Sequence, residues 1–397
     1  MSYRQFLRLW SLAALVGLFG CDGGSETFSL PPVTSEGSER ISLFSGRVMV
    51  PEGIASQEVW LGPGADRLTG LSSLAFYVDG ADGERLALGV EDATGKVVID
   101  ANASEFSINR ALSGVGSVSA QLPVASAALP LAPPYKLTVR RYRSALPAEM
   151  IGVRVWGKYP RPEAAVPQTQ ALQVQWILAG GVVPEPQLLQ AMERARNIWR
   201  QAGIELQEAP RSELDNNIKP QVAHLAIDAA LGSDTAALKS LLRLSELAIG
   251  DGLPLFLVND VTLAPSGELW ALSGGIPVPA ATGTDRSGVV VSAALLKRDP
   301  MFAGQILAHE IGHALGLFHT TESVVLTQAG APTAINDGLA DTSACPASAD
   351  GNADRRLSSS ECHAYDAGNL MFWGTPSGAI TLTPQQADVA RRSLLTK

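Results

Sequence analysis

The sequence is short of cysteine and has no dense cluster of positive charge. Only three cysteines occur among the 397 residues, Cys21, Cys345 and Cys362. The formal net charge is −9 and no five or more Lys and Arg residues gather in one cluster, which argues against nucleic acid as a partner. Hydrophobic residues make up 46% of the chain and charged residues 17%, so the chain can bury a sizeable core and is not disordered. Its length suits two domains.

The start of the chain is typical of an export signal. Arg4 and Arg8 are positive, and Leu9–Phe19 form an apolar segment too short for a stable transmembrane span. The segment closes with Leu18-Phe19-Gly20-Cys21, which resembles the lipobox of bacterial lipoproteins. The alternative interpretation is an ordinary secretory signal that contains a Cys.

The resemblance to a lipobox implies where the protein works. Residues 1–20 would be removed as a signal peptide, and Cys21 would carry a lipid anchor in the inner or outer membrane of the cell envelope. Residues 21–40, rich in Gly, Ser, Glu and Pro, would then form a flexible tether. With Cys21 lipidated, Cys345 and Cys362 remain, and an oxidising compartment favours a disulfide between them. Two free thiols would fit the export signal poorly.

Residues 41–158 are predicted to form a β-sandwich. Short runs of β-forming residues alternate with turn pairs such as Asp79-Gly80 and Thr94-Gly95, at the spacing of an antiparallel sandwich. The predicted strands are Gly46–Val50, Leu74–Val78, Leu86–Val90, Lys96–Ile99, Tyr135–Tyr142 and Ile151–Trp156. No His, paired-carboxylate or nucleophile constellation is found in them, so a binding or spacer role is the preferred interpretation.

A second domain is predicted at 171–397, after a proline-containing linker at 159–170. It begins with an alternating strand at Leu172–Leu178, followed by apolar residues at helical spacing up to Trp199 and a stop signal at Gly203. Further strands are predicted at Ile204–Gln207, Pro254–Val261 and Gly288–Ser292, with a helical insertion at Ala229–Ala248. The whole chain is therefore expected to have an α+β fold.

A metal-binding pattern lies on a predicted helix in this second domain. Asp299 can cap the helix with Pro300 in the first position, and Met301–Leu315 contain no proline. His309 and His313 are four residues apart, so both imidazoles lie on one face and can bind one ion.

Three further features make this pattern more specific. Glu310 is placed about 100° around the helix from His309, where it can bond a water rather than the metal. Gly316 can adopt the left-handed conformation that ends a helix, which lets the chain turn back and bring His319 as third ligand. Three histidines leave an open position, as a catalytic zinc requires, whereas a structural zinc normally has four protein ligands, often Cys. The sequence therefore predicts a zinc site of His309, His313 and His319 with Glu310 as general base.

The extended motif resembles that of the metzincin zinc peptidases. Asn369-Leu370-Met371 lies where metzincins place the Met-turn, so the resemblance implies that Met371 forms an apolar floor below the three histidines. More narrowly, the pattern is similar to the pappalysin family, in its Thr after the third His, Asp-Thr before the Met-turn and Thr-Pro-x-Gln before a final helix. These positions are Thr320, Asp341-Thr342 and Thr383-Pro384-Gln385-Gln386. Two residues after the Met, the family usually has Tyr, whereas this chain has Trp373. Trp has no phenol, so the resemblance does not carry the role of the family's Tyr over to this position.

The resemblance implies a metzincin domain with a twisted mixed sheet and a zinc-binding helix, which cleaves protein or peptide substrates outside the cytoplasm. We expect a monomer. No Cys lies between Cys21 and the motif, so a cysteine-switch latency mechanism has no candidate residue. Two alternatives stay open: a surface-anchored binding protein with an impaired metzincin scaffold, and a hydrolase of non-protein substrates, which the ligand spacing disfavours.

A calcium loop is the second metal site that the sequence suggests. Asp350, Asn352, Asp354 and Glu361 match positions one, three, five and twelve of such a loop, but Arg355 stands where it prefers Gly. A polar loop closed by the disulfide is the preferred interpretation.

Overall fold

A computed structural model describes most of the chain after residue 40. The described residues are 26–28, 40–61, 71–101, 110–123, 134–142, 147–159, 169–180, 183–228, 230–248, 252–264, 267–326, 330–374 and 380–397. The predicted signal peptide, the predicted lipidation site Cys21, nearly all of the predicted tether and most of the predicted linker lie outside these residues. Within them, no helix is both long and apolar enough to cross a membrane.

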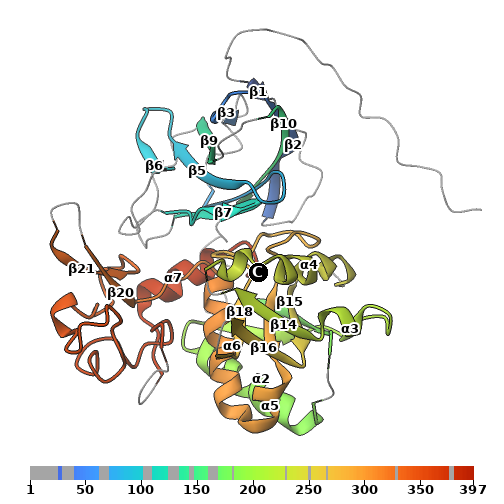
Figure 1. Ribbon diagram of the computed structural model, residues 1–397, viewed down its shortest axis with the longest axis vertical. Coiled ribbons are helices and arrows are strands. Elements are labelled where there is room, and N and C mark those ends of the chain that lie inside the picture. The colour runs from blue at the N-terminus through green and yellow to red at the C-terminus, as the bar shows by residue number, and fades with distance from the viewer. Residues whose placement is uncertain are drawn as a thin grey trace, which may run out of the picture.

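Two sheets, here called the sheet pair, make up the N-terminal part of the fold (Figure 1), and their strands are antiparallel except for β1, which is parallel to β3. One sheet has the order β2-β10-β4-β8 and the other contains β3-β9-β5-β6, with β7 beside β5 and β1 beside β3. The strands are β1 Glu26–Phe28, β2 Arg40–Val50, β3 Ser56–Leu61, β4 Ser73–Asp79, β5 Arg85–Glu91, β6 Val97–Ile99, β7 Gly114–Val115, β8 Ser117–Leu122, β9 Tyr135–Tyr142 and β10 Glu149–Lys158. Residues of both sheets share one buried core.

Side-chain alternation explains how this core forms. In β9, Tyr135, Leu137 and Val139 are buried while the residues between them are partly exposed, which is the period of two of a strand with one apolar face. In β4, by contrast, six successive residues are buried. Phe76 and Val78 belong to the core between the two sheets, whereas Tyr77 packs on the opposite face. The second face of β4 is therefore covered by the rest of the protein.

The C-terminal part is built on a mixed sheet of order β12-β11-β15-β19-β18, and we call residues 170–397 the C-terminal unit. Neighbouring strands from β12 to β19 are parallel, and β18 is antiparallel to β19 at the edge. Its strands are β11 Gln170–Leu178, β12 Ile204–Glu208, β13 Ser212–Glu213, β15 Leu253–Val258, β18 Ala271–Ser273 and β19 Val289–Ser292. A smaller sheet contains β14 His224–Asp228, β16 Asp260–Ala264 and β17 Glu268–Leu269, and β20 Thr321–Leu326 pairs with β21 Pro332–Asn336.

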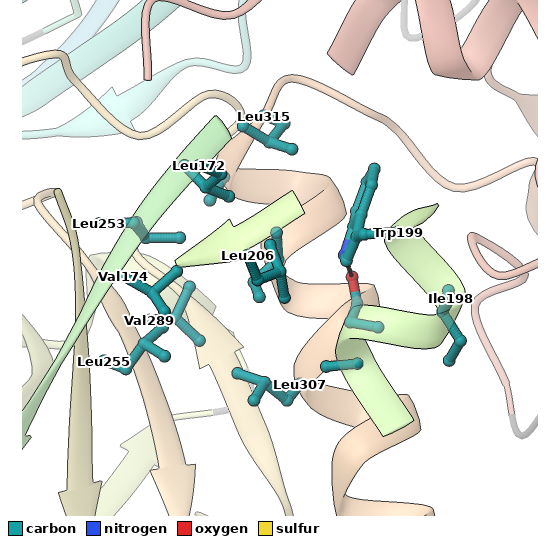
Figure 2. Packing of buried hydrophobic residues seen from close by; sticks show 14 of the residues in the cluster. Leu172, Val174, Ile198, Trp199, Leu206, Leu253, Leu255, Val289, Leu307 and Leu315 are labelled. Carbon is teal, nitrogen blue, oxygen red and sulfur yellow. Dashed lines mark hydrogen bonds between the residues drawn. The ribbon is translucent and has the colours of Figure 1, made fainter. Parts of the chain in front are cut away.

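Two helices pack together against one face of the mixed sheet. They are α2 Glu185–Arg200 and α6 Pro300–Ala314, and their apolar residues form one core with β11, β15 and β19 (Figure 2). A side chain at Gly304 would place its Cβ 2.3 Å from the Ala191 carbonyl oxygen, so glycine is needed for the close approach. Trp199 is fully buried, and its indole nitrogen donates to the Ala308 carbonyl at 3.2 Å. This packing fixes helix α6 against the sheet.

Two sequence predictions about this part need correction. Ala229–Ala248 was expected to be one helical insertion, but only α4 Ala236–Arg243 is an α-helix, with short 3-10 turns at η2 Gly232–Asp234 and η3 Leu244–Leu247. The run Pro254–Val261 is two strands, β15 and β16, because it crosses from the mixed sheet to the smaller one. The remaining helices are α3 Lys219–Val222, α5 Ala293–Arg298 and α7 Pro384–Arg392, with η4 Ala347–Ala349. The mixture of sheets and helices agrees with an α+β fold.

Candidate metal centre

Helix α6 carries the first two predicted ligands. Asp299 caps the helix, since its carboxylate accepts from the Phe302 amide at 2.9 Å, and Pro300 occupies the first turn. The helix ends where Gly316 adopts φ +100° and the Leu317 amide donates back to the Gly312 carbonyl at 2.9 Å. This turn brings the chain back toward the helix, so that His319 lies beside His309 and His313.

The three imidazoles converge on one point through their Nε2 atoms. The Nε2 atom of His319 lies 3.2 Å from that of His309 and 3.0 Å from that of His313. Three nitrogens bound to one tetrahedral zinc at ~2.0–2.1 Å would be about 3.3 Å apart. The spacing therefore fits a single zinc ion.

The Nδ1 atoms show which nitrogen is free to bind metal. Nδ1 of His309 lies 2.7 Å from the Leu370 carbonyl, and Nδ1 of His313 lies 2.7 Å from the Leu317 carbonyl. A carbonyl can only accept, so both Nδ1 atoms carry a proton and both Nε2 atoms present lone pairs. His319 Nδ1 faces the Glu322 carboxylate at 3.3 Å, which orients the third ring in the same way.

Burial keeps the two helix histidines neutral. It lowers the pKa of His309 to about 3, and the charge of His319 adds to that effect. Burial likewise lowers the pKa of His313 well below its usual range. Neutral imidazoles are the form that binds metal. Three lone pairs at these distances repel one another, and a cation between them removes that repulsion.

Glu310 is positioned beside the histidines and not among the ligands. Its carboxylate is 8% exposed and accepts from the Ser273 amide of β18 at 2.7 Å. Burial raises the pKa of Glu310 to about 7, against smaller opposing contributions from the Ser273 amide and His319. A carboxylate of that pKa can take and return a proton near neutral pH.

Met371 lies directly below the ligand helix. A Cβ added at Gly312 would be 2.4 Å from the Met371 sulfur, so glycine is required there for the contact. The Met371 carbonyl accepts from the Thr320 amide at 3.0 Å, which ties this turn to the residue after His319. Met371 is fully buried. Met371 therefore packs against the helix that carries His309 and His313, at Gly312.

The structure also shows the contacts of the two paired cysteines and of Trp373. A disulfide joins Cys345 and Cys362, the two cysteines that the sequence analysis pairs. Trp373 donates its indole N–H to the Leu357 carbonyl at 2.7 Å, so this N–H is not directed at a substrate.

The predicted calcium loop is held together by its own amides. Asp350 accepts from the Arg355 amide at 3.0 Å, and Glu361 accepts from the Gly351 and Ser358 amides, each at 2.9 Å. Within the described part of the chain, the acidic side chains of this loop do not belong to any converging group of three potential ligands. The structure therefore gives calcium no support, and the polar-loop interpretation accounts for these residues.

Two cavities meet at Glu310. The larger has a volume of about 650 Å³ and is also lined by His313 and His319. The smaller has a volume of about 280 Å³ and is also lined by His309 and Trp373. Open space therefore adjoins Glu310 in both cavities.

The sequence analysis missed several groups that hold the site. The Leu370 and Leu317 carbonyls and the Ser273 amide are main-chain atoms, which carry no residue-type signal. Glu322 carries one, because an acidic residue three positions after a ligand histidine is a candidate to orient it.

Comparisons with known proteins add little to this picture. No protein-family profile matches the chain, and no curated protein sequence is similar to it. Among solved structures, archaemetzincin from Methanopyrus kandleri is similar at 16% identity over 59% of this chain and 91% of that one, with a TM-score of 0.29. Metalloproteinase-II from Bacteroides fragilis is similar at 13% identity over 42% of this chain and 52% of that one, with a TM-score of 0.27. The chain spans about half of the second protein. Similarity this low bears on neither fold nor activity, and the function is argued from the site itself.

Proposed function

We propose that the protein is a zinc-dependent hydrolase. The observation that supports this proposal is the convergence of three imidazoles, in which Nε2 of His319 lies 3.2 Å from that of His309 and 3.0 Å from that of His313, with the buried Glu310 beside them. A zinc ion bound there would supply Lewis-acid activation of a substrate carbonyl and of a water.

More particularly, we propose a zinc endopeptidase similar to the pappalysins, exported and anchored to the cell envelope through lipidated Cys21. Glu310 would take the proton of the attacking water and return it to the leaving amine, since its pKa of about 7 suits both steps. The Ser273 amide holds the carboxylate in position through its hydrogen bond.

The edge strand β18 suits an extended peptide. It is the last strand of the mixed sheet and pairs with β19 on one side, so its other edge can pair with an added chain. Trp270 and Ala271 line the smaller cavity, and Leu272 and Ser273 line the larger one. A peptide paired with β18 would therefore pass Glu310 with residues on both sides of the cleaved bond, as an endopeptidase requires.

The test compares the mature chain with its Glu310→Ala variant, and with Glu193→Ala as a matched control on the exposed face of α2. We expect one zinc per chain in all three proteins, and cleavage of casein or unstructured peptides by the parent and the control only. Zinc in every protein with cleavage in none would favour the alternative, a surface-anchored binding protein with an impaired site.

A separate experiment tests the proposed lipid anchor at Cys21. Labelled fatty acid should be incorporated into the full-length chain in bacteria and not into Cys21→Ala, and that variant should leave the membrane fraction. Equal membrane association of both proteins would contradict a lipid anchor at Cys21.

A further inference from the structure

Strand β8 of the sheet pair has two different faces. One face consists of residues in the core between the two sheets, Val118, Ala120 and Leu122. The other face consists of polar residues that are at most 6% exposed, Ser117, Ser119 and Gln121. Each of these three side chains donates a hydrogen bond to a residue of the C-terminal unit. The polar face of β8 is therefore matched to the part of the chain that carries the metal motif.

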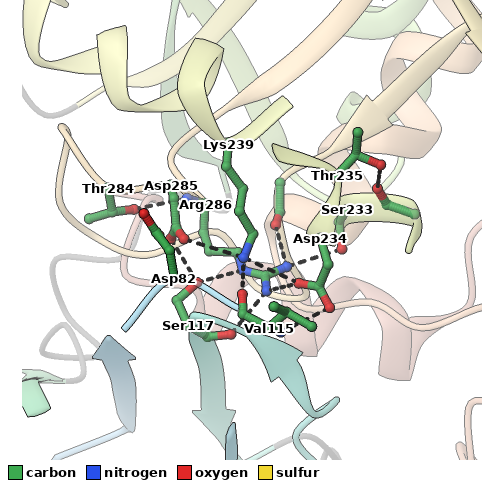
Figure 3. A network of polar contacts seen from close by, with 12 residues as sticks. Asp82, Val115, Ser117, Ser233, Asp234, Thr235, Lys239, Thr284, Asp285 and Arg286 are labelled. Atoms are coloured by element: carbon green, nitrogen blue, oxygen red, sulfur yellow. Dashed lines mark hydrogen bonds and ion pairs between the residues drawn. The ribbon is translucent and has the colours of Figure 1, made fainter. Parts of the chain in front are cut away.

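The first of these contacts belongs to a largely buried polar cluster, the junction network of Ser117, Asp234, Lys239, Asp285 and Arg286 (Figure 3). Asp285 accepts from the Ser117 hydroxyl at 2.7 Å, and the Arg286 guanidinium donates to the Ser117 carbonyl at 2.9 Å. The same guanidinium donates to the Gly274 carbonyl at 3.3 Å. The network thus connects β8 to the chain at Gly274.

Gly274 belongs to a short segment, residues 273–278, that is bonded to helix α6 at both ends. At one end, the Ser273 amide donates to the Glu310 carboxylate at 2.7 Å. At the other end, the Val278 amide donates at 3.1 Å to the carbonyl of Ala314, the last residue of α6. A shift of the segment would therefore move the amide that holds Glu310.

Ser119 of β8 holds the segment near its second end. Its hydroxyl donates to the Pro277 carbonyl at 2.6 Å, and this contact is buried. A Cβ added at Gly275 would lie 3.0 Å from the Ser119 hydroxyl oxygen and 2.8 Å from the Pro277 carbonyl oxygen, so glycine is needed for β8 to pack this closely. The sheet pair thus packs directly on the backbone that positions Glu310.

Gln121 contacts the turn that brings in the third ligand. A Cβ added at Gly316 would lie 3.5 Å from the Gln121 side-chain nitrogen, which also donates to the Val389 carbonyl of α7 at 3.4 Å. Gly316 has φ +100° and ends the ligand helix before His319. Ser119 and Gln121 therefore contact two backbone segments that both lead to the metal centre.

We propose that the sheet pair supports the metal centre, and that Ser119 is a positioning residue for the Glu310 carboxylate, acting through the 273–278 segment. The inference rests on the proposed peptidase function, because it concerns the step that Glu310 would catalyse. It differs from the binding or spacer role that the sequence favours for residues 41–158. Misplacing a reacting group by about 1 Å can cost about 100-fold in rate, so a smaller displacement of Glu310 is expected to be measurable.

The test compares Ser119→Ala with Ser73→Ala in the zinc-loaded full-length chain. Ser73 is the matched control: it is a buried serine of β4 whose hydroxyl donates to the Arg392 carbonyl of α7 at 2.7 Å. Both variants lose one hydroxyl between the sheet pair and the C-terminal unit, but only Ser119 bonds to the 273–278 segment.

The first measurement is the kinetics of cleavage of a fluorogenic peptide, with kcat expressed per bound zinc. In Ser119→Ala, kcat should fall about tenfold while KM stays within about twofold of the parent, because Glu310 acts in the chemical step. In Ser73→Ala, both constants should stay within about twofold. A role in stability alone would lower the folded fraction of both variants and leave kcat per bound zinc unchanged.

The second measurement is hydrogen exchange followed by mass spectrometry, which does not depend on activity. The amides of Ser273, Gly274 and Val278 are all hydrogen-bonded, and a loosened segment breaks these bonds more often. Peptides that cover residues 271–278 should exchange at least about fivefold faster in Ser119→Ala than in the parent or in Ser73→Ala. A general loss of stability would instead accelerate exchange in α2 and α6 as well.

Each outcome decides the inference. A lower kcat and faster exchange of residues 271–278, both confined to Ser119→Ala, support it. A parental kcat in Ser119→Ala, or equal losses in the two variants, overturns it and leaves the peptidase function standing. If the zinc-loaded parent cleaves no peptide, the proposed function is overturned, and the exchange measurement alone decides whether Ser119 holds the segment: faster local exchange supports that role, and unchanged exchange overturns it.

Discussion

Two buried polar clusters in this molecule differ in how their members are matched. One cluster, the junction network, consists of Ser117, Asp234, Lys239, Asp285 and Arg286 (Figure 3). In it, Arg286 and Lys239 are cations that face the carboxylates of Asp234 and Asp285 and the carbonyls of the sheet pair. In the metal centre, the Nε2 atoms of three imidazoles point at one another, and the two imidazoles on helix α6 are neutral. The first cluster is complete as it stands, whereas the second is complementary only to a cation.

The difference teaches how to tell a structural polar cluster from a binding site. Burial makes unmatched polar groups costly, so a cluster with internal partners can serve stability, while a converging set of like groups has its partner elsewhere. Variants of each cluster should therefore affect different quantities: the free energy of unfolding for the junction network, and zinc affinity for the metal centre.

The largest expected effect on stability is at Arg286. In Arg286→Met, Asp234 loses its buried guanidinium partner, and the free energy of unfolding should fall by about 3–5 kcal/mol. Urea denaturation measures this, with Arg298→Met as control, because the exposed Arg298–Glu268 pair should contribute less than about 1 kcal/mol. Equal losses of unfolding free energy in Arg286→Met and Arg298→Met would contradict a special contribution of the junction network to stability.

His319→Ala should act on the metal centre in the opposite way. Zinc affinity should fall by more than about 100-fold, the upper range for losing only a residue that orients a ligand. The free energy of unfolding of the metal-free protein should change little, because removing one imidazole also removes lone-pair repulsion. Competition with a chelating dye measures the affinity, and His224→Ala, at an exposed histidine, should bind zinc like the parent.

The carboxylate of Asp337 combines a matched and an unmatched oxygen, and its titration makes the free energy of unfolding depend on pH. One of its carboxylate oxygens accepts from the Leu339 amide and the Thr342 hydroxyl, and the other is buried with no partner among the described residues. Burial raises the pKa of Asp337 from 3.8 to about 6, so the folded state binds more protons than the unfolded state between those values. Its stabilising contribution is present below about pH 4 and is lost as the pH rises through about 6.

Asp337→Asn should remove that dependence. Relative to the parent, the variant should gain on the order of 2 kcal/mol in unfolding free energy between pH 4 and pH 7. Chemical denaturation across this range, in the presence of a chelator, measures the difference. A constant difference between the two proteins would show that the Asp337 carboxylate does not titrate there.

The smallest effect is expected at Thr383, at the partly exposed start of helix α7. Thr383 begins α7 with a capping box, in which its hydroxyl accepts from the Gln386 amide and the Gln386 side chain accepts from the Thr383 amide. Thr383→Ala should cost about 1 kcal/mol, and Thr383→Ser should cost much less, because Ser is also a good cap. Thermal unfolding of the two variants measures these changes, with which the larger changes expected at the buried clusters are compared.

The helix that carries the metal motif could be predicted because its signals are local. Asp299, Pro300 and Gly316 mark its two ends, and the spacing of His309 and His313 follows from helix geometry. The strands of the sheet pair were predicted less completely, since β1, β3, β7 and β8 were missed. In β8 all six residues are buried, including Ser117, Ser119 and Gln121, because one face of the strand packs on the sheet-pair core and the other on the C-terminal unit. Polar residues that find partners across a junction do not show the alternation that identifies a strand.

The sequence by itself determined which three histidines come together, which carboxylate lies beside them and which helix carries His309, Glu310 and His313. These features depend on residue type and on spacing within about ten positions. Only the tertiary structure decided which main-chain carbonyls orient the histidines, that Ser273 holds Glu310, and that Arg110 faces the same cavity as His319. Apart from the local contact between His313 and Leu317, these contacts join residues 37 to more than 200 positions apart. Several of them use main-chain atoms that every residue possesses. Their formation depends on the packing of whole sheets and helices, which short-range patterns in the sequence do not encode.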